Sequence, residues 1–180
     1  MATTSALRLR PVPLTRDLFA PFGDVIETRG HPHYTINSGY AERYSDLAQI
    51  DVGERDGQVR VSIFHARPRD LPMPIRMVER HPLASQMFVS LAGNPFLVVV
   101  ARPGHGPAVG DLHAFVTDGR QGVNYARGTW HHSLIAYGSA SDFLIIDRSG
   151  PGRNVDEVVF GDEEIMLEPP ASGTPERMRV

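Results

Sequence analysis

The stretch RMVERHPLASQMFVSLAG, residues 76–93, combines three polar side chains with the alternation of a β-strand. Side chains along a strand alternate between its two faces, so Glu79 and His81 are predicted to point to the same side. Gln86 begins the segment that follows, and Gly93 ends the alternation as a turn residue. A carboxylate, an imidazole and an amide are therefore predicted to converge on one cavity.

A second stretch, GVNYARGTWHHSL at residues 122–134, is predicted to complete this cavity. Gly128 supplies a turn suited to positive φ, which glycine adopts without strain. His131 and His132 are adjacent on a strand and face opposite ways, so only one of them is expected to enter the cavity. Two segments about fifty residues apart, each bringing histidine to a strand beside a glycine turn, predict a shared pocket in a small β-barrel.

The rest of the chain consists of short strand-like runs separated by Gly, Pro or Asp. One short helix is expected from the capping residue Thr15 to Phe19. Roughly ten short strands with one or two short helices predict an all-β barrel or sandwich. Beyond the two stretches above, strands are expected within residues 7–13, 22–27, 59–64, 96–102, 111–118, 141–150 and 155–167.

The composition excludes several catalytic mechanisms and kinds of metal ligand. The chain has no cysteine, which excludes disulfides, thiolate nucleophiles and thiolate metal ligands. All 18 basic residues are arginine, which excludes lysine Schiff-base chemistry. Any metal must therefore be held by histidine, carboxylate or amide oxygen.

The charge and hydropathy of the chain indicate which partners and which cellular compartment to expect. The net charge of −3 gives no global basic surface for nucleic acid or anionic lipid. No apolar run approaches the roughly twenty residues of a membrane span, and the N-terminus lacks a signal-peptide core. A cytoplasmic protein without nucleic-acid or membrane partners is expected.

Residues 31–52, HPHYTINSGYAERYSDLAQIDV, are polar and aromatic without regular alternation. Such a stretch inside a compact domain is typically a surface or binding loop. Its notable members are Asn37, Arg43 and Tyr44. Because arginine captures carboxylates through two parallel hydrogen bonds, Arg43 is a candidate for binding a small acid.

The spacing E-x-H-x(4)-Q-x(6)-G, from Glu79 to Gly93, resembles the first cupin motif, H-x-H-x(4)-E-x(6)-G. Glutamate replaces the first histidine, and Gln86 replaces the usual glutamate. The spacing A-x-G-x-x-H, ending at His131, resembles the second motif, P-x-G-x-x-H, with alanine in place of proline.

From about Leu7 to about Phe160 the chain resembles the ureidoglycolate lyase family, formerly called ureidoglycolate hydrolases. The blocks that carry the resemblance occur in the family's order: FAPFGDVIE, INSGYAERYSDL, ERHPLASQMFVSL, GVNYARGTWHHSL and DFLIIDR. Ser45 and Ser133 depart from the family's usual RYHDL and WHHPL.

This resemblance implies an all-β, cupin-like barrel or jelly roll with one or two short helices. A single domain is expected over residues 1–165, with a flexible C-terminal tail over 166–180. The activity implied is that of a carbon–nitrogen lyase of the amidine-lyase class, which converts (S)-ureidoglycolate to glyoxylate and urea in allantoin catabolism. The family usually forms homodimers, and a divalent metal, nickel in particular, is associated with its activity.

Ureidoglycolate carries a hydroxyl and a urea nitrogen on one carbon, so its cleavage needs a base for the hydroxyl proton and an acid for the departing nitrogen. The expected catalytic residues surround that hydroxyl directly or through a divalent cation that lowers its pKa. Without a metal, the same residues are expected to relay protons, with Glu79 as base and a histidine as acid. They are Glu79, His81, Gln86 and His131, of which His81, Gln86 and His131 are the metal candidates. The expected substrate-binding residues are Asn37, Arg43, Tyr44 and Tyr125.

Two other functions fit the same residues. One is a metal-dependent cupin that acts on another small carboxylic acid. The other is a non-catalytic cupin that binds a small molecule.

Overall fold

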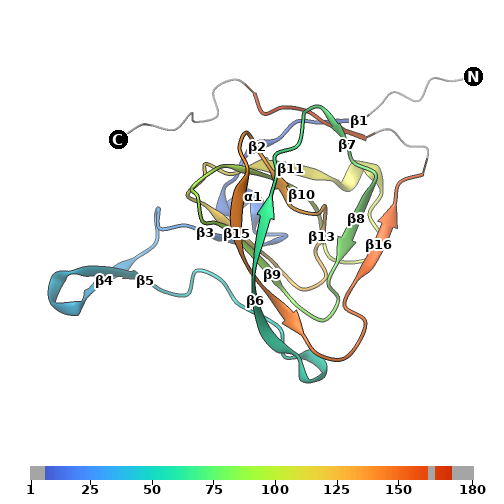
Figure 1. Ribbon diagram of the computed structural model, residues 1–180. Helices are drawn as coiled ribbons and strands as arrows, with labels where there is room; N and C mark the ends of the chain where they lie inside the picture. Colours follow the sequence, from blue (N-terminus) through green and yellow to red (C-terminus); the bar gives the residue numbers. More distant parts are fainter. Residues whose placement is uncertain (1–6, 162–164, 172–180) are drawn as a thin grey trace, which may run out of the picture.

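The computed structural model describes residues 7–161 and 165–171, which fold almost entirely as β-strands (Figure 1). The strands are β1 (Leu7–Leu9), β2 (Val12–Pro13), β3 (Gly23–Ile26), β4 (His33–Ile36), β5 (Ala41–Tyr44), β6 (Gln58–Ala66), β7 (Met73–Pro74), β8 (Met77–Arg80), β9 (Gln86–Ser90), β10 (Phe96–Ala101), β11 (His113–Val116), β12 (Gly122–Tyr125), β13 (Trp130–His131), β14 (Ile135–Ala136), β15 (Ser141–Ser149), β16 (Asp156–Val159) and β17 (Ile165–Leu167). The helical elements are α1 (Arg16–Phe19) and the 3-10 turns η1 (Asn37–Gly39), η2 (Glu54–Asp56) and η3 (Val109–Asp111). In the described part of the chain, no helix is long and apolar enough to cross a membrane.

Three sheets form layers around two apolar clusters. A five-stranded sheet has the order β3-β12-β9-β15-β6, and a seven-stranded sheet runs β16-β8-β13-β10-β11-β2 with β14 also paired to β10. Phe88 and Phe143 of the first sheet pack with Phe96 and Phe115 of the second in one cluster. A three-stranded sheet, β1-β17-β7, covers the other face of the seven-stranded sheet.

Strand β10 explains the continuous apolar run FLVVVAR. Phe96, Val98 and Val100 belong to the cluster between the two large sheets. Leu97 and Val99 belong to the cluster under the three-stranded sheet. Because both faces of β10 are covered, neither face carries a polar residue.

Within residues 7–161 and 165–171, the outer face of the five-stranded sheet has no such cover. Two rows of aliphatic side chains cross β6, β15 and β9 there, at positions opposite one another in the strand register. Val61 and Ile63 are 63% and 54% exposed. We call this surface the aliphatic face; its residues are Val61, Ile146 and Met87 in one row and Ile63, Leu144 and Val89 in the other.

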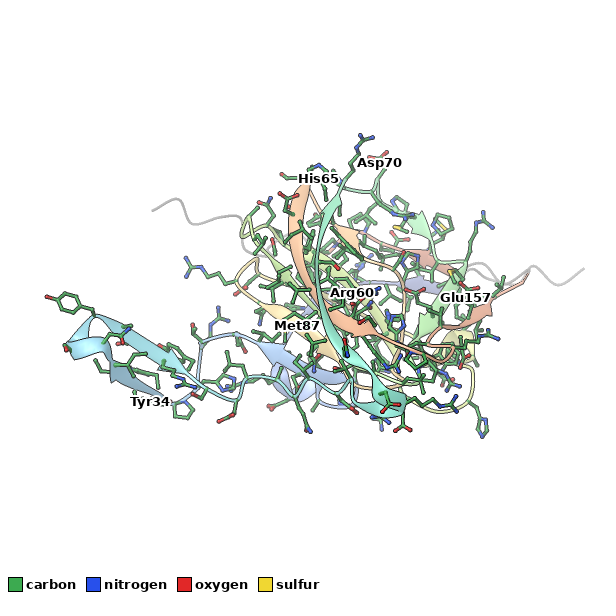
Figure 2. All side chains as sticks on the ribbon, turned by 60° about the horizontal axis from the view of Figure 1, so that its bottom comes forward. Tyr34, Arg60, His65, Asp70, Met87 and Glu157 are labelled. Atoms are coloured by element: carbon green, nitrogen blue, oxygen red, sulfur yellow. The ribbon has the colours of Figure 1, made fainter. Side chains whose placement is uncertain are left out.

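Strands β4 and β5 form a separate hairpin that stands off the barrel (Figure 1). Figure 2 shows Tyr34 on this hairpin, well apart from Arg60 and Glu157 on the barrel. We call residues 33–44, which comprise β4, η1 and β5, the arm. The irregular loop expected over residues 31–52 is thus partly wrong, because its middle forms paired strands.

The prediction of an all-β, cupin-like fold is confirmed. Thr15 caps α1 as expected, because its hydroxyl accepts a hydrogen bond from the amide of Leu18 at 3.3 Å. The single strand expected over residues 7–13 is divided into β1 and β2, which join different sheets. Pro11 lies at the break, and it has no amide hydrogen to donate to a ladder.

The expected boundary at residue 165 needs a correction. Met166 and Leu167 belong to β17, which pairs in parallel with β1. Ile165 and Leu167 are buried in the apolar cluster under the three-stranded sheet, so packed structure continues through Leu167. The part of the expected tail from residue 172 onward lies outside the described residues.

Candidate active site

The two stretches singled out in the sequence lie side by side. β13 pairs with β8 in antiparallel register, which puts His131 directly opposite Glu79. The amide of Gly128 donates a hydrogen bond to the carbonyl of His81 at 3.0 Å. Gly128 has φ +78°, so the predicted glycine turn is confirmed and links the second stretch to the first.

Glu79, His81 and His131 form one group, which we call the site cluster. One ligand atom from each lies within 4.8 Å of the other two. Glu79 Oε1 is 3.8 Å from His131 Nε2, and the two imidazole rings are 5.1 Å apart between centroids. The predicted convergence of Glu79, His81 and one histidine of the 131–132 pair is confirmed for these three residues.

Backbone carbonyls set the tautomer of both histidines. His81 Nδ1 donates to the carbonyl of Asn154 at 2.7 Å, and His131 Nδ1 donates to the carbonyl of Thr129 at 2.9 Å. With hydrogen on Nδ1, each neutral ring carries a lone pair on Nε2. Both Nε2 atoms are buried and have no hydrogen-bond partner among the described residues. The site cluster therefore contains two imidazole nitrogens with free lone pairs, close enough to bind one ion or one substrate atom.

Burial keeps His131 neutral. The side chain is 2% exposed, and this burial, together with the nearby His81, lowers the pKa of His131 from 6.5 to about 3. The Thr129 carbonyl opposes this shift in part. His131 is therefore uncharged near neutral pH, where it can act as a metal ligand or a hydrogen-bond acceptor and not as a proton donor.

The ring of Tyr125 packs against His131. The two rings are stacked, with centroids 4.3 Å apart and planes 20° apart. Burial raises the pKa of the Tyr125 phenol, and the charge of Glu79 raises it further. Tyr125 therefore remains protonated near neutral pH and can donate a hydrogen bond.

Gln86 enters from the opposite sheet. It begins β9, lies across from Tyr125 in the strand register, and is 8% exposed. Its Oε1 is buried without a hydrogen-bond partner in the described part of the chain. Gln86 therefore lies beside Tyr125 with a free acceptor oxygen, which fits its expected place in the pocket. The catalytic or metal-binding role of Gln86 stays a prediction.

His132 points away from the cluster, as expected for one histidine of the pair. Its Nδ1 donates to the carbonyl of Ser133 at 2.8 Å, and its backbone amide donates to Val99. Burial lowers its pKa as well. His132 follows β13, and its amide ties this segment to β10.

Known proteins place the chain in a family. A model of the ureidoglycolate lyase family matches residues 6–168. The chain belongs to the ureidoglycolate lyase family. The ureidoglycolate lyase of Pseudomonas paraeruginosa (strain DSM 24068 / PA7) is 51% identical over 162 residues, which cover 89% of this chain and 96% of the relative. The ureidoglycolate lyase of Pseudomonas putida (strain W619) is 50% identical over 155 residues, or 86% and 93% of the two chains.

Among solved structures, RmlC from Streptococcus suis in complex with dTDP-D-xylose has a TM-score of 0.43 at 12% identity, over 82% of this chain and 74% of that chain. The resemblance to the ureidoglycolate lyase family that the sequence blocks indicated is confirmed by the family match and by the relatives.

In this member of the ureidoglycolate lyase family, the site cluster fits a divalent metal. Two imidazole nitrogens with free lone pairs and one carboxylate are donors suited to nickel, manganese or zinc. The backbone carbonyls that fix both tautomers are the outer contacts such ligands usually have.

The expected substrate-binding residues fall in two places. Tyr125 lies against the site cluster. Asn37, Arg43 and Tyr44 all belong to the arm, which stands off the barrel of their own chain (Figure 1). Within one chain, therefore, the structure does not bring them to the site cluster.

Asn154 is a site residue that the sequence analysis missed. Its carbonyl accepts from His81 Nδ1, while its side-chain Oδ1 accepts from the amide of Leu83 at 2.8 Å. It lies 73 positions from His81 in a loop after β15, and no motif marks it. Only the fold brings it to His81.

Proposed function

We propose that this chain cleaves ureidoglycolate, the (S)-form by family resemblance, to glyoxylate and urea. The observation that carries the proposal is the site cluster: one carboxylate and two neutral imidazoles with unused Nε2 lone pairs, in a member of the ureidoglycolate lyase family. A buried group of proton acceptors is what the first step of carbinolamide cleavage requires.

The reaction moves one proton across the substrate. The carboxylate of Glu79 takes the proton of the substrate hydroxyl, the C–O bond becomes a carbonyl, and the C–N bond breaks with its electron pair on nitrogen. The departing urea nitrogen then takes up one proton. Since His131 is held neutral by burial, the protonated Glu79 itself is the proposed proton donor. Atoms balance as glyoxylate plus urea.

We assign His81 and His131, through Nε2, to a divalent metal, with Gln86 Oε1 as the third protein ligand. Nickel is the metal suggested by family resemblance. A bound divalent ion would polarise the substrate hydroxyl and lower its pKa, which eases proton removal by Glu79. In this assignment Glu79 acts as base and not as a required ligand, so metal content and turnover can be separated by mutation.

We propose that Tyr125 lines the substrate pocket beside His131. Its phenol stays protonated and can donate a hydrogen bond to a substrate oxygen. We propose that Arg43, with Asn37 and Tyr44, binds the substrate carboxylate. This role requires the arm to reach a site cluster.

We further propose a single cupin-like domain that assembles as a homodimer in the cytoplasm. The aliphatic face supports the assembly, because exposed rows of valine, isoleucine, leucine and methionine on a sheet favour burial against a partner. An interface built from one such face on each copy has two-fold symmetry.

The test is a coupled assay that follows glyoxylate and urea released from (S)-ureidoglycolate, with allantoate as the control substrate. Release of both products in equal amounts, above the uncatalysed rate, is expected with ureidoglycolate alone. Urea from allantoate would point to a different reaction. Tight binding of glyoxylate without turnover would favour the non-catalytic alternative, and turnover of another small carboxylic acid alone would favour the second enzyme alternative.

A further inference from the structure

We propose that the arm of one chain reaches a second copy and places Arg43 at the mouth of that copy's site. The inference rests on the proposed function, because it gives Arg43 the carboxylate of ureidoglycolate as its ligand. It adds that neither copy has a complete site alone.

The arm has no core of its own. Its strands contact chiefly each other and η1, and none of its residues is buried. Tyr40 at the turn is 92% exposed, and Tyr34 is 51% exposed. A two-stranded hairpin is at best marginally stable in water, so this conformation requires a surface to pack against.

The site cluster contains no guanidinium that could bind the carboxylate of the substrate. The cluster consists of one carboxylate and two imidazoles, and no arginine belongs to it. Three arginines of the barrel already bind aspartates: Arg60 binds Asp147, Arg80 binds Asp156 and Arg127 binds Asp51. A guanidinium from a second copy would supply the bidentate partner that a carboxylate favours.

Arg43 is available for this role. Within the described residues it has no carboxylate partner, and its guanidinium lies over the ring of Tyr34 at 5.8 Å. A guanidinium stacked on an aromatic ring keeps its hydrogen-bond donors free for a carboxylate. Asn37 and Tyr44, the other expected substrate-binding residues, belong to the same hairpin.

The direction of the arm points to a partner. Both views show it extending away from its own barrel (Figures 1 and 2). β6 is the edge strand of the five-stranded sheet, and it exposes Val61 and Ile63 on the outer face and Phe64 toward the interior. An edge strand with exposed apolar side chains is a surface that proteins normally cover.

The length of the arm suits a crossing of this edge. Four residues of β4 span roughly 13 Å, and stacked sheets lie roughly 10 Å apart. An arm that extends from the barrel of one copy (Figure 1) is therefore long enough to pass over β6 of the other and reach its interior. Tyr34 and Tyr40 would then pack against the exposed apolar residues of β6.

The test combines two impaired variants in one dimer. Arg43→Ala is expected to lose roughly 10- to 100-fold in kcat/KM, the usual loss when a charged hydrogen-bonding partner is removed. Arg43→Lys should recover part of this loss, and Arg8→Ala, which removes an exposed arginine of β1, should have no effect. Glu79→Gln is expected to lower turnover by about 10²- to 10⁴-fold in the copy that carries it.

A heterodimer of Arg43→Ala and Glu79→Gln chains, purified through a different tag on each, separates the two models. If Arg43 acts in the partner, one of the two sites has an intact Glu79 and an intact arm, and about half of the wild-type activity per dimer returns. If Arg43 acts in its own chain, both sites are defective and the heterodimer is as inactive as its parents, which overturns the proposal. Full activity of the Arg43→Ala homodimer overturns it as well.

A second readout does not depend on turnover. The chain has no cysteine, so a Tyr40→Cys chain mixed with a Ser62→Cys chain can be joined by a short bis-maleimide only through these two positions. A cross-linked dimer in the mixture, and not in either variant alone, is expected. Monomers in sedimentation experiments, or no cross-link in the mixture, would overturn the proposal, whereas a cross-link without ureidoglycolate turnover by wild-type protein would refute only the proposed function.

Discussion

Replacement of Glu79 by glutamine isolates the proposed base. The change keeps the shape of the side chain and removes only its capacity to accept a proton. A positioned general base contributes about 10²- to 10⁴-fold to a rate, so kcat should fall by that factor, which corresponds to about 2.7–5.5 kcal/mol in the activation barrier.

The same substitution should cost little stability. Glu79 is 27% exposed, and its ion-pair-range contact is His131 Nε2 at 3.8 Å. The pKa of His131 is about 3, so this imidazole is uncharged near pH 7 and no ion pair is lost. The free energy of unfolding should therefore change by less than about 1 kcal/mol, since no cavity or unpaired buried charge is created.

Three measurements on one preparation check this reasoning: kcat for glyoxylate release, the free energy of unfolding in urea, and bound metal by elemental analysis. Glu157→Gln is the matched control, because Glu157 lies directly opposite Glu79 on the neighbouring β16. We expect the control to be active and Glu79→Gln to be folded, metal-loaded and inactive. A Glu79→Gln enzyme with near-wild-type kcat would refute the base assignment, and loss of the metal would make Glu79 a ligand.

Four further outcomes are expected. Chelation should abolish turnover, and add-back of nickel should restore it; full activity in metal-free protein would exclude a metal role. Gln86→Glu should tighten metal binding through its added charge and raise KM for the anionic substrate, as measured by metal titration and kinetics. In chelator-treated protein, His131 should bind a proton below about pH 6.5 in the unfolded chain but only below about pH 3 in the folded chain. The free energy of unfolding, measured in urea, should therefore fall on acidification between these values by up to about 1.4 kcal/mol per pH unit. His131→Gln should flatten this slope. Gly119→Ala should lose about 1–3 kcal/mol in thermal unfolding, because its new Cβ would lie 2.3 Å from the carbonyl oxygen of Gly93 at φ +86°, whereas Gly138→Ala, at φ +75° with open space, should lose less.

The sequence predicts those parts of the site that local periodicity determines. Glu79 and His81 share a face because strand side chains alternate, and the structure places both in the site cluster. His131 enters the cluster and His132 does not, for the same reason. The apolar run of β10 is predictable as a strand, and its length without a polar residue reflects cover on both faces.

Features that depend on long-range packing are not predictable in this way. Asn154 reaches His81 from a loop 73 positions later, and nothing in its neighbourhood distinguishes it from a solvated loop residue. The alternation of Ile165 and Leu167 is too short to be told from a frayed end, yet β1 pairs with it and buries both. Residues 33–44 contain few aliphatic side chains, and their pairing as β4 and β5 depends on backbone hydrogen bonds rather than on a periodic apolar face.

The second motif acts through its backbone as much as through its histidine. The amide of Gly128 donates a hydrogen bond to the carbonyl of His81. This bond fixes the distance between the segment of residues 76–93 and the segment of residues 122–134. Thr129, two positions before His131, supplies the carbonyl that holds hydrogen on His131 Nδ1. The spacing from Gly128 to His131 therefore sets both the position and the tautomer of the imidazole, and the same tautomer at His81 depends on a carbonyl from a distant loop. A variant that shifts Gly128 should consequently disturb both histidines at once, which explains why a glycine at this spacing belongs to the chemistry of the site and not only to its turn.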